Sequence, residues 1–545
     1  MLRFIAECLF LSIFFATVRR QFRRFTKSEL KKIRGPRSPS FWKGDLPQMF
    51  DPNGWDYHRR LWNNYGRVIR FRGMVGENML YTYDPKALHH ILVKDQDVFE
   101  QTPPVIAGSK LFFGPGLLSS HGEYHKRQRK LLNPVFSTTH MRQMLPTVYA
   151  IMHRLEAAIV SQVQNGSKEI DMLSWMGRTA LELIGQSGFG YSFDDLTDKY
   201  TEESFSRGIK RIMPLTLEMV FLRVYALHHL IKIGSDSFRK KVISALPWKS
   251  MHEGRNIADA MHKTSYEIYH KRKQALLDGT ADEDFHEKDL LSILIKANLD
   301  TSKPDQERPS EEENYAQIAT FIFAGTETTS NSTACILWLL AQNPDVQTKL
   351  RKEIREAMEN ADGEIPHDEL VALPYLDAIC RETLRLYAPV WQLLRKPIKD
   401  IFRILPLSQP IIGVDGREIS EIFVPKGTTV MCGLMASNRN TDIWGPDADE
   451  WKPERWLEGL PDSVSDAHLP GIYSHLMSFS AGGRSCIGFK FSQLEMKTVL
   501  AVLLARFEFS LSQEVTWRMT NIASPVAIRC DAMNPRLPLM VKLAA

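Results

Sequence analysis

Cysteine is scarce in this sequence. Six cysteines are spread over 545 residues, and no two have the spacing of a CxxC motif. Neither a disulfide framework nor a cysteine-based zinc site is indicated, so a reducing compartment is favoured. A hydrophobic content of 43% and a charged content of 24% are those of an ordinary packed protein, which excludes disordered, collagenous and polytopic membrane classes.

The body of the chain also lacks a surplus of positive charge. Residues 1–40 contain ten of the 69 Lys and Arg residues but two of the 64 Asp and Glu residues, so the remaining 59 basic and 62 acidic residues nearly balance. A nucleic-acid-binding protein needs a basic surface, so this class is excluded. The net charge of +5 thus combines a basic leader with a near-neutral body.

The leader combines an apolar run with a basic flank. Phe4–Val18 is predominantly apolar apart from Glu7, and RRQFRR follows directly. As a helix these residues reach about 22 Å, short of the roughly 30 Å core of a bilayer. Secretory signals are not normally followed by a dense basic cluster, so we expect residues 1–18 to anchor the chain, with the body cytoplasmic. A cleavable signal peptide and a merely apolar terminal helix are the alternatives.

A short spacer separates the leader from the rest. Gly35, Pro36 and Pro39 interrupt any helix, so we expect residues 19–40 to form a basic, proline-containing linker. No repeat, low-complexity tract or second linker follows. Residues 41–545 are therefore expected to fold as one domain, although length alone would suggest three or four domains of roughly 150 residues.

Helical periodicity dominates the body from about Met141 onwards. Apolar residues recur at three- and four-residue spacing with charges between them, which predicts amphipathic helices. The clearest are Met141–Val163, Asn256–Leu277, Asp289–Ala297 and Val346–Glu359. Strand character is found at Arg67–Arg72, at Met79–Tyr83 and in residues 401–435. The expected fold class is mainly α with a small β region.

A glycine-rich loop surrounds one of the cysteines. Residues 479–488 read FSAGGRSCIG, with Gly482, Gly483 and Gly488 around Cys486. Glycine lets the backbone turn tightly and present several N–H groups to one sulfur atom. Those donors, a nearby arginine and a helix start after the loop would lower a thiol pKa and favour a thiolate metal ligand. A buried structural cysteine is the alternative that these residues leave open.

The spacing of this loop is shared with a known family. Phe479-x-x-Gly482-x-Arg484-x-Cys486-x-Gly488 resembles the haem-binding signature of the cytochrome P450 family of haem-thiolate monooxygenases. The resemblance extends from about Pro36 to the C-terminus. It implies the helical P450 fold, haem b as cofactor, Cys486 as axial iron ligand, and Phe479 and Arg484 as further haem-binding residues.

A second signature lies in RETLRLYAP. Glu382 and Arg385 are three residues apart on an expected helix and so share a face, which by itself would indicate only a surface ion pair. The pair resembles the Glu-x-x-Arg motif of the family. The resemblance implies that Arg455, in the segment PERW, completes a charge network that serves folding and haem retention.

A third signature is Gly325-Thr326-Glu327-Thr328-Thr329, inside a helix expected from about Glu311 to Ala341. Hydroxyl groups that bond back to carbonyls four residues earlier bend helices, so a local opening is expected, and a slightly kinked core helix is the alternative. The segment resembles the oxygen-activation segment of the family. The resemblance implies that Thr328 positions dioxygen and water, that Glu327 supplies protons, and that Gly325 lies at the haem.

A fourth signature is incomplete. Family members commonly carry Trp-x-x-x-Arg where this chain has His125 and Arg129, which share a helical face. The resemblance implies that both reach the haem propionates, with His125 replacing the tryptophan. The neighbouring Lys126, Arg127 and Lys130 are expected to form a solvated basic face that docks an acidic redox partner.

Apolar residues dominate the segments that would face the substrate. Matching the family segments assigns to the pocket Ile106, Phe112, Phe113, Phe323, Ala324, Val390, Trp391 and Val526. Such a lining predicts a hydrophobic substrate that is held by shape with few hydrogen bonds, although the same residues are typical of any core. Ile209–Leu230 is expected to form a mobile roof that dips into the membrane.

The resemblance implies a monooxygenase that oxidises a hydrophobic small molecule with O2. Electrons would come from NADPH through cytochrome P450 reductase, with cytochrome b5 as a further partner, at the endoplasmic reticulum membrane. No dinucleotide-binding fingerprint occurs, which is consistent with a separate reductase. The sequence is most similar to fungal microsomal members, many of which act on terpenoids or other secondary metabolites.

Three other functions are weighed against this one. The chain could be a haem-thiolate isomerase or dehydratase, a monooxygenase of polyketides or aromatic compounds, or a haem-binding protein without turnover. Retention of Glu327 and Thr328 argues against the first and the last.

Overall fold

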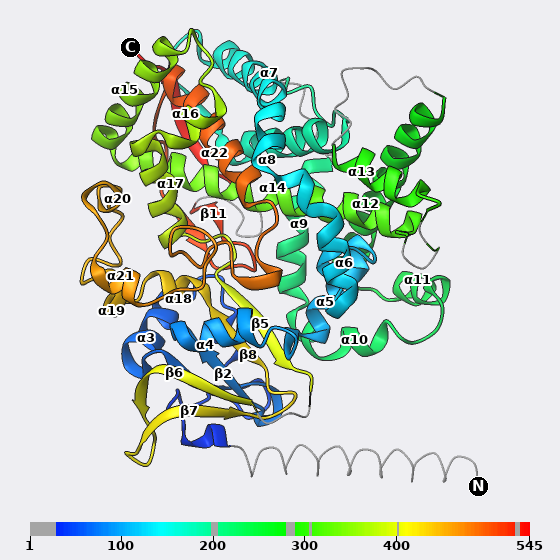
Figure 1. The fold of residues 1–545 in the computed structure, drawn as a ribbon, viewed down its shortest axis with the longest axis vertical. Helices are drawn as coiled ribbons and strands as arrows, with labels where there is room; N and C mark the ends of the chain where they lie inside the picture. Colours follow the sequence, from blue (N-terminus) through cyan, green and yellow to red (C-terminus); the bar gives the residue numbers. More distant parts are fainter. Residues whose placement is uncertain are drawn as a thin grey trace.

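Helices build most of the molecule. The computed structural model describes residues 29–197, 205–278, 289–302, 304, 308–399, 403–528 and 535–545. Helices fill the upper and right parts of the view in Figure 1. The labelled strands β2, β5, β6, β7 and β8 gather in the lower part with α3 and α4, and β11 lies nearer the centre. The mainly α fold class with a small β region is confirmed.

The longer helices carry the frame. Those of ten or more residues are α3 (Trp55–Tyr65), α5 (Pro103–Phe113), α6 (Gly122–Leu132), α7 (Thr138–Val163), α8 (Met172–Ile184), α9 (Phe205–Glu218), α11 (Asp236–Ala245), α12 (Lys249–Leu277), α13 (Leu290–Leu299), α14 (Glu311–Gln342), α15 (Pro344–Asn360), α17 (Pro374–Leu386) and α22 (Phe489–Arg506). The four helices expected from periodicity all form, as α7, α12, α13 and α15, within a few residues of their expected ends except that α12 begins earlier.

Short helices connect these elements. They are α2 (Leu46–Met49), α4 (Pro85–His89), α10 (Leu227–Leu230), α16 (His367–Ala372), α18 (Leu434–Asn438), α19 (Thr441–Trp444), α20 (Arg455–Glu458) and α21 (Asp462–Asp466). One π-helical turn, η7 (Leu222–Ala226), joins α9 to α10.

Helix α14 is the central helix of the body. Its first turn carries Glu311, Glu312 and Glu313, and Ser310 and Glu313 form a reciprocal capping box that satisfies free N–H groups at this end. The helix packs against α8, α12, α17 and α22. Most of its residues between Ala316 and Ala341 are buried, so it passes through the core.

Small sheets lie beside the helices. The largest has the strand order β1-β2-β8-β5-β3, formed by Val68–Arg72, Asn78–Thr82, Val430–Gly433, Gln392–Pro397 and Phe99–Gln101. Only β2 and β8 in this sheet are parallel. The other sheets are β4-β12-β9 (Lys168–Asp171, Pro538–Leu543, Phe507–Leu511), β6-β7 (Arg403–Ile412, Glu418–Val424) and β10-β11 (Val515–Arg518, Ser524–Ala527). The strands expected near residues 67–83 and 401–435 are confirmed.

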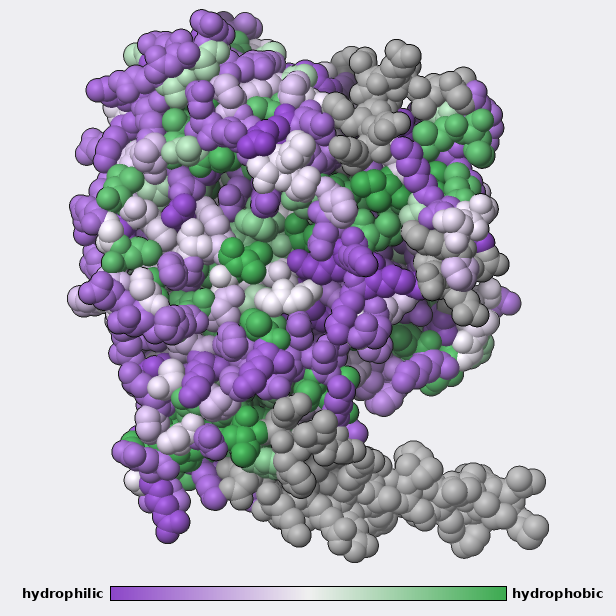
Figure 2. Space-filling view, in the orientation of Figure 1, coloured by the Kyte–Doolittle hydropathy of each residue, from purple (hydrophilic) through white to green (hydrophobic). Residues whose placement is uncertain are grey.

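The leader falls outside the described residues. Residues 1–18, expected to anchor the chain, and the first part of the linker precede Glu29. Within the described ranges, no helix combines the length and the apolar character needed to cross a bilayer. Polar side chains cover most of the face drawn in Figure 2, with hydrophobic residues in small groups between them.

Candidate active site

The cysteine loop lies directly before α22. The N–H of Cys486 donates to the carbonyl of Phe479 at 2.9 Å, which closes the loop at its base. Gly482 has a φ of +67°, and a Cβ added there would lie 1.9 Å from the carbonyl oxygen of Leu92. Only glycine fits that position, because the backbone conformation and the close approach both exclude a side chain. The helix expected after the loop begins at Phe489.

Cys486 is exposed to solvent, although many protein atoms lie around its thiol. Burial raises its pKa, whereas the N–H of Gly488 and the charge of Arg129 lower it. The expectation that N–H donors and a nearby arginine would dominate is therefore wrong for the protein alone. The N–H of Gly483 bonds instead to Gln96 at 2.8 Å. A bound metal ion, however, deprotonates a coordinating thiol outright.

A buried charge network lies between α17 and the loop before α20. Glu382 and Arg385 are fully buried and form a bidentate pair at 2.8 Å. Arg455 approaches Glu382 at 3.4 Å and pairs with Asp447 at 2.8 Å. The indole N–H of Trp456 also donates to Glu382, at 3.0 Å. The structure thus brings together the three residues that the resemblance grouped.

The segment expected to open locally remains helical. Helix α14 runs without interruption from Glu311 to Gln342. The hydroxyl of Thr328 donates to the carbonyl of Ala324 at 2.9 Å, and Thr333 bonds back to Thr329 in the same way. The hydroxyls therefore add bonds to the helix without breaking its ladder. Gly325 packs against Ile184 of α8, where a Cβ would lie 3.4 Å from the nearest side-chain atom.

Glu327 is held by a residue that the sequence did not indicate. Its carboxylate is buried and lies 3.1 Å from the ammonium group of Lys210 on α9. Lys210 also donates to the hydroxyl of Ser330 at 3.0 Å. A small cavity of about 10 Å³ touches Lys210, Glu327 and Asn331, which is room for about one water molecule.

The similarity of this chain to known proteins shows which family it belongs to. Residues 34–537 match the family model described as cytochrome P450. The chain belongs to the cytochrome P450 family. A cytochrome P450 monooxygenase from Postia placenta is 50% identical over 99% of this chain and 98% of its own.

Two further P450 relatives also cover nearly the whole chain. A ganoderic acid synthetase from Ganoderma lucidum is 41% identical over 96% of both chains. A cytochrome P450 monooxygenase from Hericium erinaceus is 34% identical over 96% of this chain and 95% of its own. The protein is therefore an oxygen-incorporating oxidoreductase of this family, and the family implies haem and O2.

The residues beside the cysteine loop of this P450 fit a haem. Arg129, Arg395 and Arg484 surround His125, and burial together with these three charges lowers the pKa of His125 to about 3. Among the described residues, the only ion pair of these three guanidinium groups joins Arg484 to Glu100 at 2.8 Å. Such a positive surplus fits the two propionates of a haem. The thiol of Cys486 supplies the donor that haem iron takes in this family.

Arg395 was missed by sequence reasoning. It lies on β5 and is buried, and its guanidinium bonds to the carbonyl of Leu394 at 3.0 Å. The only signal available was a lone arginine within the strand sequence QLLRKP. A neutral His125 can donate its ring N–H to a propionate, so its expected role is compatible with its lowered pKa.

Part of the expected substrate pocket is brought together. The rings of Phe113 and Phe323 stack at a centroid distance of 4.7 Å, and Phe112 packs against Phe113. Ala324 follows Phe323 on α14 and is partly exposed, as are Ile106 on α5 and Val390. Val526 is buried in β11.

Trp391 lies apart from this group. Its ring makes an edge contact with His58 at 4.8 Å, and its N–H donates to the carbonyl of Thr520 at 2.8 Å. It packs in a separate cluster with Met435 and Met519. The contacts of Trp391 are therefore those of a core residue that fixes the chain before β5.

The basic face on α6 is partly neutralised. Lys126 pairs with Glu123 at 2.9 Å and with Asp97 at 3.3 Å, and Arg127 lies 3.5 Å from Glu313. The expected docking patch therefore carries less net charge than the sequence suggests. Lys130 is its exposed cation that forms no ion pair with any described residue.

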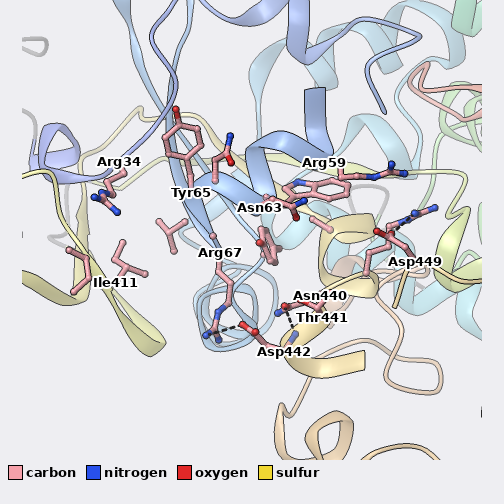
Figure 3. Close-up of a pocket in the computed structure, with 18 residues that line it drawn as sticks. Arg34, Arg59, Asn63, Tyr65, Arg67, Ile411, Asn440, Thr441, Asp442 and Asp449 are labelled. Carbon is pink, nitrogen blue, oxygen red and sulfur yellow. Dashed lines mark hydrogen bonds and ion pairs between the residues drawn. The ribbon is translucent and has the colours of Figure 1, made fainter. Parts of the chain in front are cut away.

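A cavity of about 540 Å³ lies elsewhere, between α3, β1, β6 and α19. Figure 3 shows its charged groups at different ends: Arg34 near Ile411, Arg59 towards Asp449, and Arg67 beside Asp442, 3.5 Å away. None of the expected site residues lines this cavity, and its arginines do not converge on one point.

Proposed function

We propose that this P450 hydroxylates or otherwise oxidises a hydrophobic small molecule, with electrons from NADPH supplied by a separate reductase. The observation that carries the proposal is the pairing of two sites on neighbouring helices. Cys486 lies before α22, and α14, which carries Glu327 and Thr328, packs against α22. A protein that only stored haem would not need a buried acid beside a hydroxyl on this helix.

The cofactor would be held by the residues around the cysteine loop. Cys486 would ligate the iron, and Arg129, Arg484, His125 and Arg395 would bind the propionates. When bound, the haem supplies the activation of dioxygen. Phe479 would pack beside the cofactor, and Gly325 on α14 would leave room for it.

Protons would reach the site along α14. Thr328 would orient a proton towards the oxygen being reduced, and Glu327 would replenish it from the water-sized cavity beside Lys210. Protons must arrive quickly, because slow delivery releases reducing equivalents as peroxide. The acid and the hydroxyl therefore favour oxygen chemistry over the isomerase or dehydratase alternative.

The protein is proposed to face the cytoplasm from the endoplasmic reticulum membrane. Residues 1–18 would anchor it, residues 19–40 would link the anchor to the body, and residues 41–545 would form the catalytic domain. Exposed apolar side chains extend from η7 to the start of α12; they are Phe221, Leu230, Ile233, Phe238, Val242, Leu246 and Trp248. Hydrophobic groups are visible around α10 in Figure 2.

A second exposed apolar group follows the linker. Phe41, Trp42 and Val75 are exposed, and the backbone of Val75 bonds to that of Trp42. Tyr225 of η7 connects this group to the roof, because its hydroxyl oxygen accepts a hydrogen bond from the backbone N–H of Met74 at 3.0 Å. Both groups suit one membrane-facing side. Deletion of residues 1–24 should release the protein from the membrane pellet only if these groups bind weakly.

The substrate is proposed to be lipophilic and terpenoid-like. The stacked Phe113 and Phe323 would offer a flat apolar wall. A relative at 41% identity is named a ganoderic acid synthetase, which supports a role in fungal secondary metabolism. A polyketide or aromatic substrate would suit the same wall and is the second candidate.

Labelled dioxygen gives the direct test of this proposal. The full chain, a cytochrome P450 reductase and NADPH are incubated under ¹⁸O₂ with a panel of terpenoids and aromatic polyketides, with and without cytochrome b5. A product that gains one ¹⁸O atom supports monooxygenation. Haem-loaded protein that consumes NADPH without product, or that converts substrate without NADPH, contradicts it.

A further inference from the structure

An arginine without a counter-charge lies in the roof. Arg223 belongs to η7, which packs against α5. Its side chain crosses towards α5, because its Cδ lies 4.0 Å from the position of a Cβ on Gly108. Its guanidinium reaches the side-chain oxygen of Asn521 at 3.5 Å.

The side chain of Arg223 is half-buried, and its charge is unpaired among the described residues. Within the described ranges no carboxylate forms an ion pair with it, and burial lowers its pKa to about 10. Another roof arginine, Arg211, shows the contrast, because it pairs with Glu253 at 2.7 Å and approaches Glu218 at 3.7 Å. Arginine keeps its proton at neutral pH, so the charge of Arg223 persists without compensation.

Among the described residues, Asn521 is the polar partner of this guanidinium, and its side chain is held in place. The amide nitrogen of Asn521 donates to the hydroxyl of Thr216 at 2.9 Å, which turns its oxygen towards Arg223. The turn that carries Asn521 is tied to α14, since Asn331 donates to the carbonyl of Ala523 at 3.0 Å. Arg223 is thus fixed between the roof and a turn that contacts the proton-delivery helix.

The two elements that Arg223 contacts carry, or lead to, residues of the proposed substrate pocket. Helix α5 carries Ile106 and Phe113, and the turn with Asn521 leads into β11 and Val526. Partial burial weakens the hydration of this cation, and the neutral amide of Asn521 does not compensate its charge, so an anion bound here would be stabilised. The haem propionates have their own arginines around His125, so they leave this charge without a partner.

We propose that the substrate carries a carboxylate that pairs with Arg223 while its hydrocarbon body lies along Phe113 and Phe323. The inference rests on the proposed function and adds a substrate class to it. The expected all-apolar pocket thus has one polar end, where the guanidinium can bind both carboxylate oxygens. The far end of the molecule would then reach the haem.

Matched pairs of ligands test this assignment. We would titrate the haem-loaded full chain by calorimetry at about pH 8, where carboxylic acids are ionised. The probes are abietic acid with abietinol, farnesoic acid with farnesol, and hexadecanoic acid with hexadecanol. At least one acid should bind about tenfold or more tightly than its alcohol, as expected for an ionic hydrogen bond.

Three variants locate the preference. Arg223→Gln should remove the acid preference while alcohol affinity stays within about threefold, and Arg223→Lys should keep part of it. Lys241→Gln removes an exposed cation of α11 and should change neither affinity. No acid preference in the wild type, or a preference retained in Arg223→Gln, would overturn the proposal.

The spectrum of the reduced protein with carbon monoxide separates the two levels of the account. A thiolate-type spectrum without acid preference refutes only the role of Arg223. Loss of the thiolate-type spectrum refutes the proposed function itself. If Arg223→Gln fails to bind haem, Asn521→Leu takes its place and should weaken the acid preference severalfold.

Discussion

Buried charges are the residues that distinguish this site from an ordinary core. Glu382 and Arg385 neutralise one another, and both side chains are fully buried. The buried carboxylate of Glu327 forms an ion pair with Lys210. Each charged residue depends on its partner, because a buried charge left without one lowers the free energy of unfolding by several kcal/mol. The effect of a substitution should therefore follow the partner that is lost.

Glu382→Gln should yield protein that retains little haem. The neutral amide leaves Arg385 and Arg455 without their shared carboxylate, a loss of about 3 to 5 kcal/mol for a broken buried pair. The ratio of haem to protein after purification measures the effect. Glu359→Gln changes an exposed carboxylate on α15 and should keep the wild-type ratio. Normal haem content in Glu382→Gln would contradict the proposed role.

Thr328→Ala should bind haem and substrate normally but waste electrons. Without its hydroxyl, proton transfer slows, and we expect product formation to fall by roughly 100-fold while peroxide rises. Product, peroxide and NADPH are measured together. Thr333→Ala removes a hydroxyl with the same back-bonded geometry elsewhere on α14 and should remain coupled. Tight coupling in Thr328→Ala would refute the assignment.

Contiguous motifs made part of the site predictable. Cys486 and its glycines lie within ten residues, so their spacing carried the family resemblance that implied an iron ligand. Lys210, Arg223 and Arg395 carry no such signal, because their partners lie far away in sequence or on other elements. The pKa of Cys486 was misjudged for a related reason: local N–H donors are visible in a sequence, but the density of surrounding atoms is not.

Helix α9 is tied to α14 by the charged side chain of Lys210. Lys210→Met should loosen the roof, because the hydrogen bonds to Glu327 and Ser330 are both lost. We expect faster amide exchange in α9 and a higher peroxide fraction, at a cost of about 3 kcal/mol for the broken pair. Lys210→Arg should restore part of both. Unchanged exchange and coupling in Lys210→Met would show that the pair is not a tether.

The packing of α3 should make stability depend on pH. His58 is fully buried, and burial lowers its pKa to about 4 although its contact with the Met49 carbonyl opposes this. The unfolded state therefore binds a proton that the folded state refuses between about pH 6.5 and pH 4. The stabilisation is complete above about pH 6.5 and falls by up to about 3 kcal/mol as the pH approaches 4.

Melting temperatures at pH 7 and pH 5 check this expectation. His58→Gln should lose less stability than the wild type between the two values, whatever its stability at pH 7. His153→Gln alters an exposed histidine and should behave as the wild type does. Equal slopes for wild type and His58→Gln would contradict the interpretation.

Elements were predictable where local pattern decides them. The amphipathic helices and the two strands β1 and β2 followed from local sequence pattern, whereas the antiparallel pairing of these strands is a finding of the structure. The opening expected in α14 did not occur, since its hydroxyls bond within the helix and α8 packs against Gly325. Strands β8, β5 and β3 join one sheet although β3 and β8 are more than 300 residues apart in sequence, so tertiary packing sets their pairing.

At the scale of the whole molecule, charge and apolar surface are divided unevenly. The basic leader contrasts with a near-neutral body, and Lys126 on α6 is already paired. A reductase would therefore meet a small cationic patch. Its binding to this patch should weaken less with added salt than binding to a wholly basic face would. The exposed apolar side chains of the roof lie on the side that we assign to the membrane.

The central claim is that Cys486 ligates a haem as a thiolate. The measurement that tests it most directly is the carbon monoxide difference spectrum of the reduced protein, for the wild type and for Cys486→Ser. The account predicts the red-shifted Soret band of a thiolate-ligated ferrous haem in the wild type and its loss in the variant. A haem carbonyl spectrum without that shift in the wild type, or the same shifted band in Cys486→Ser, would contradict it.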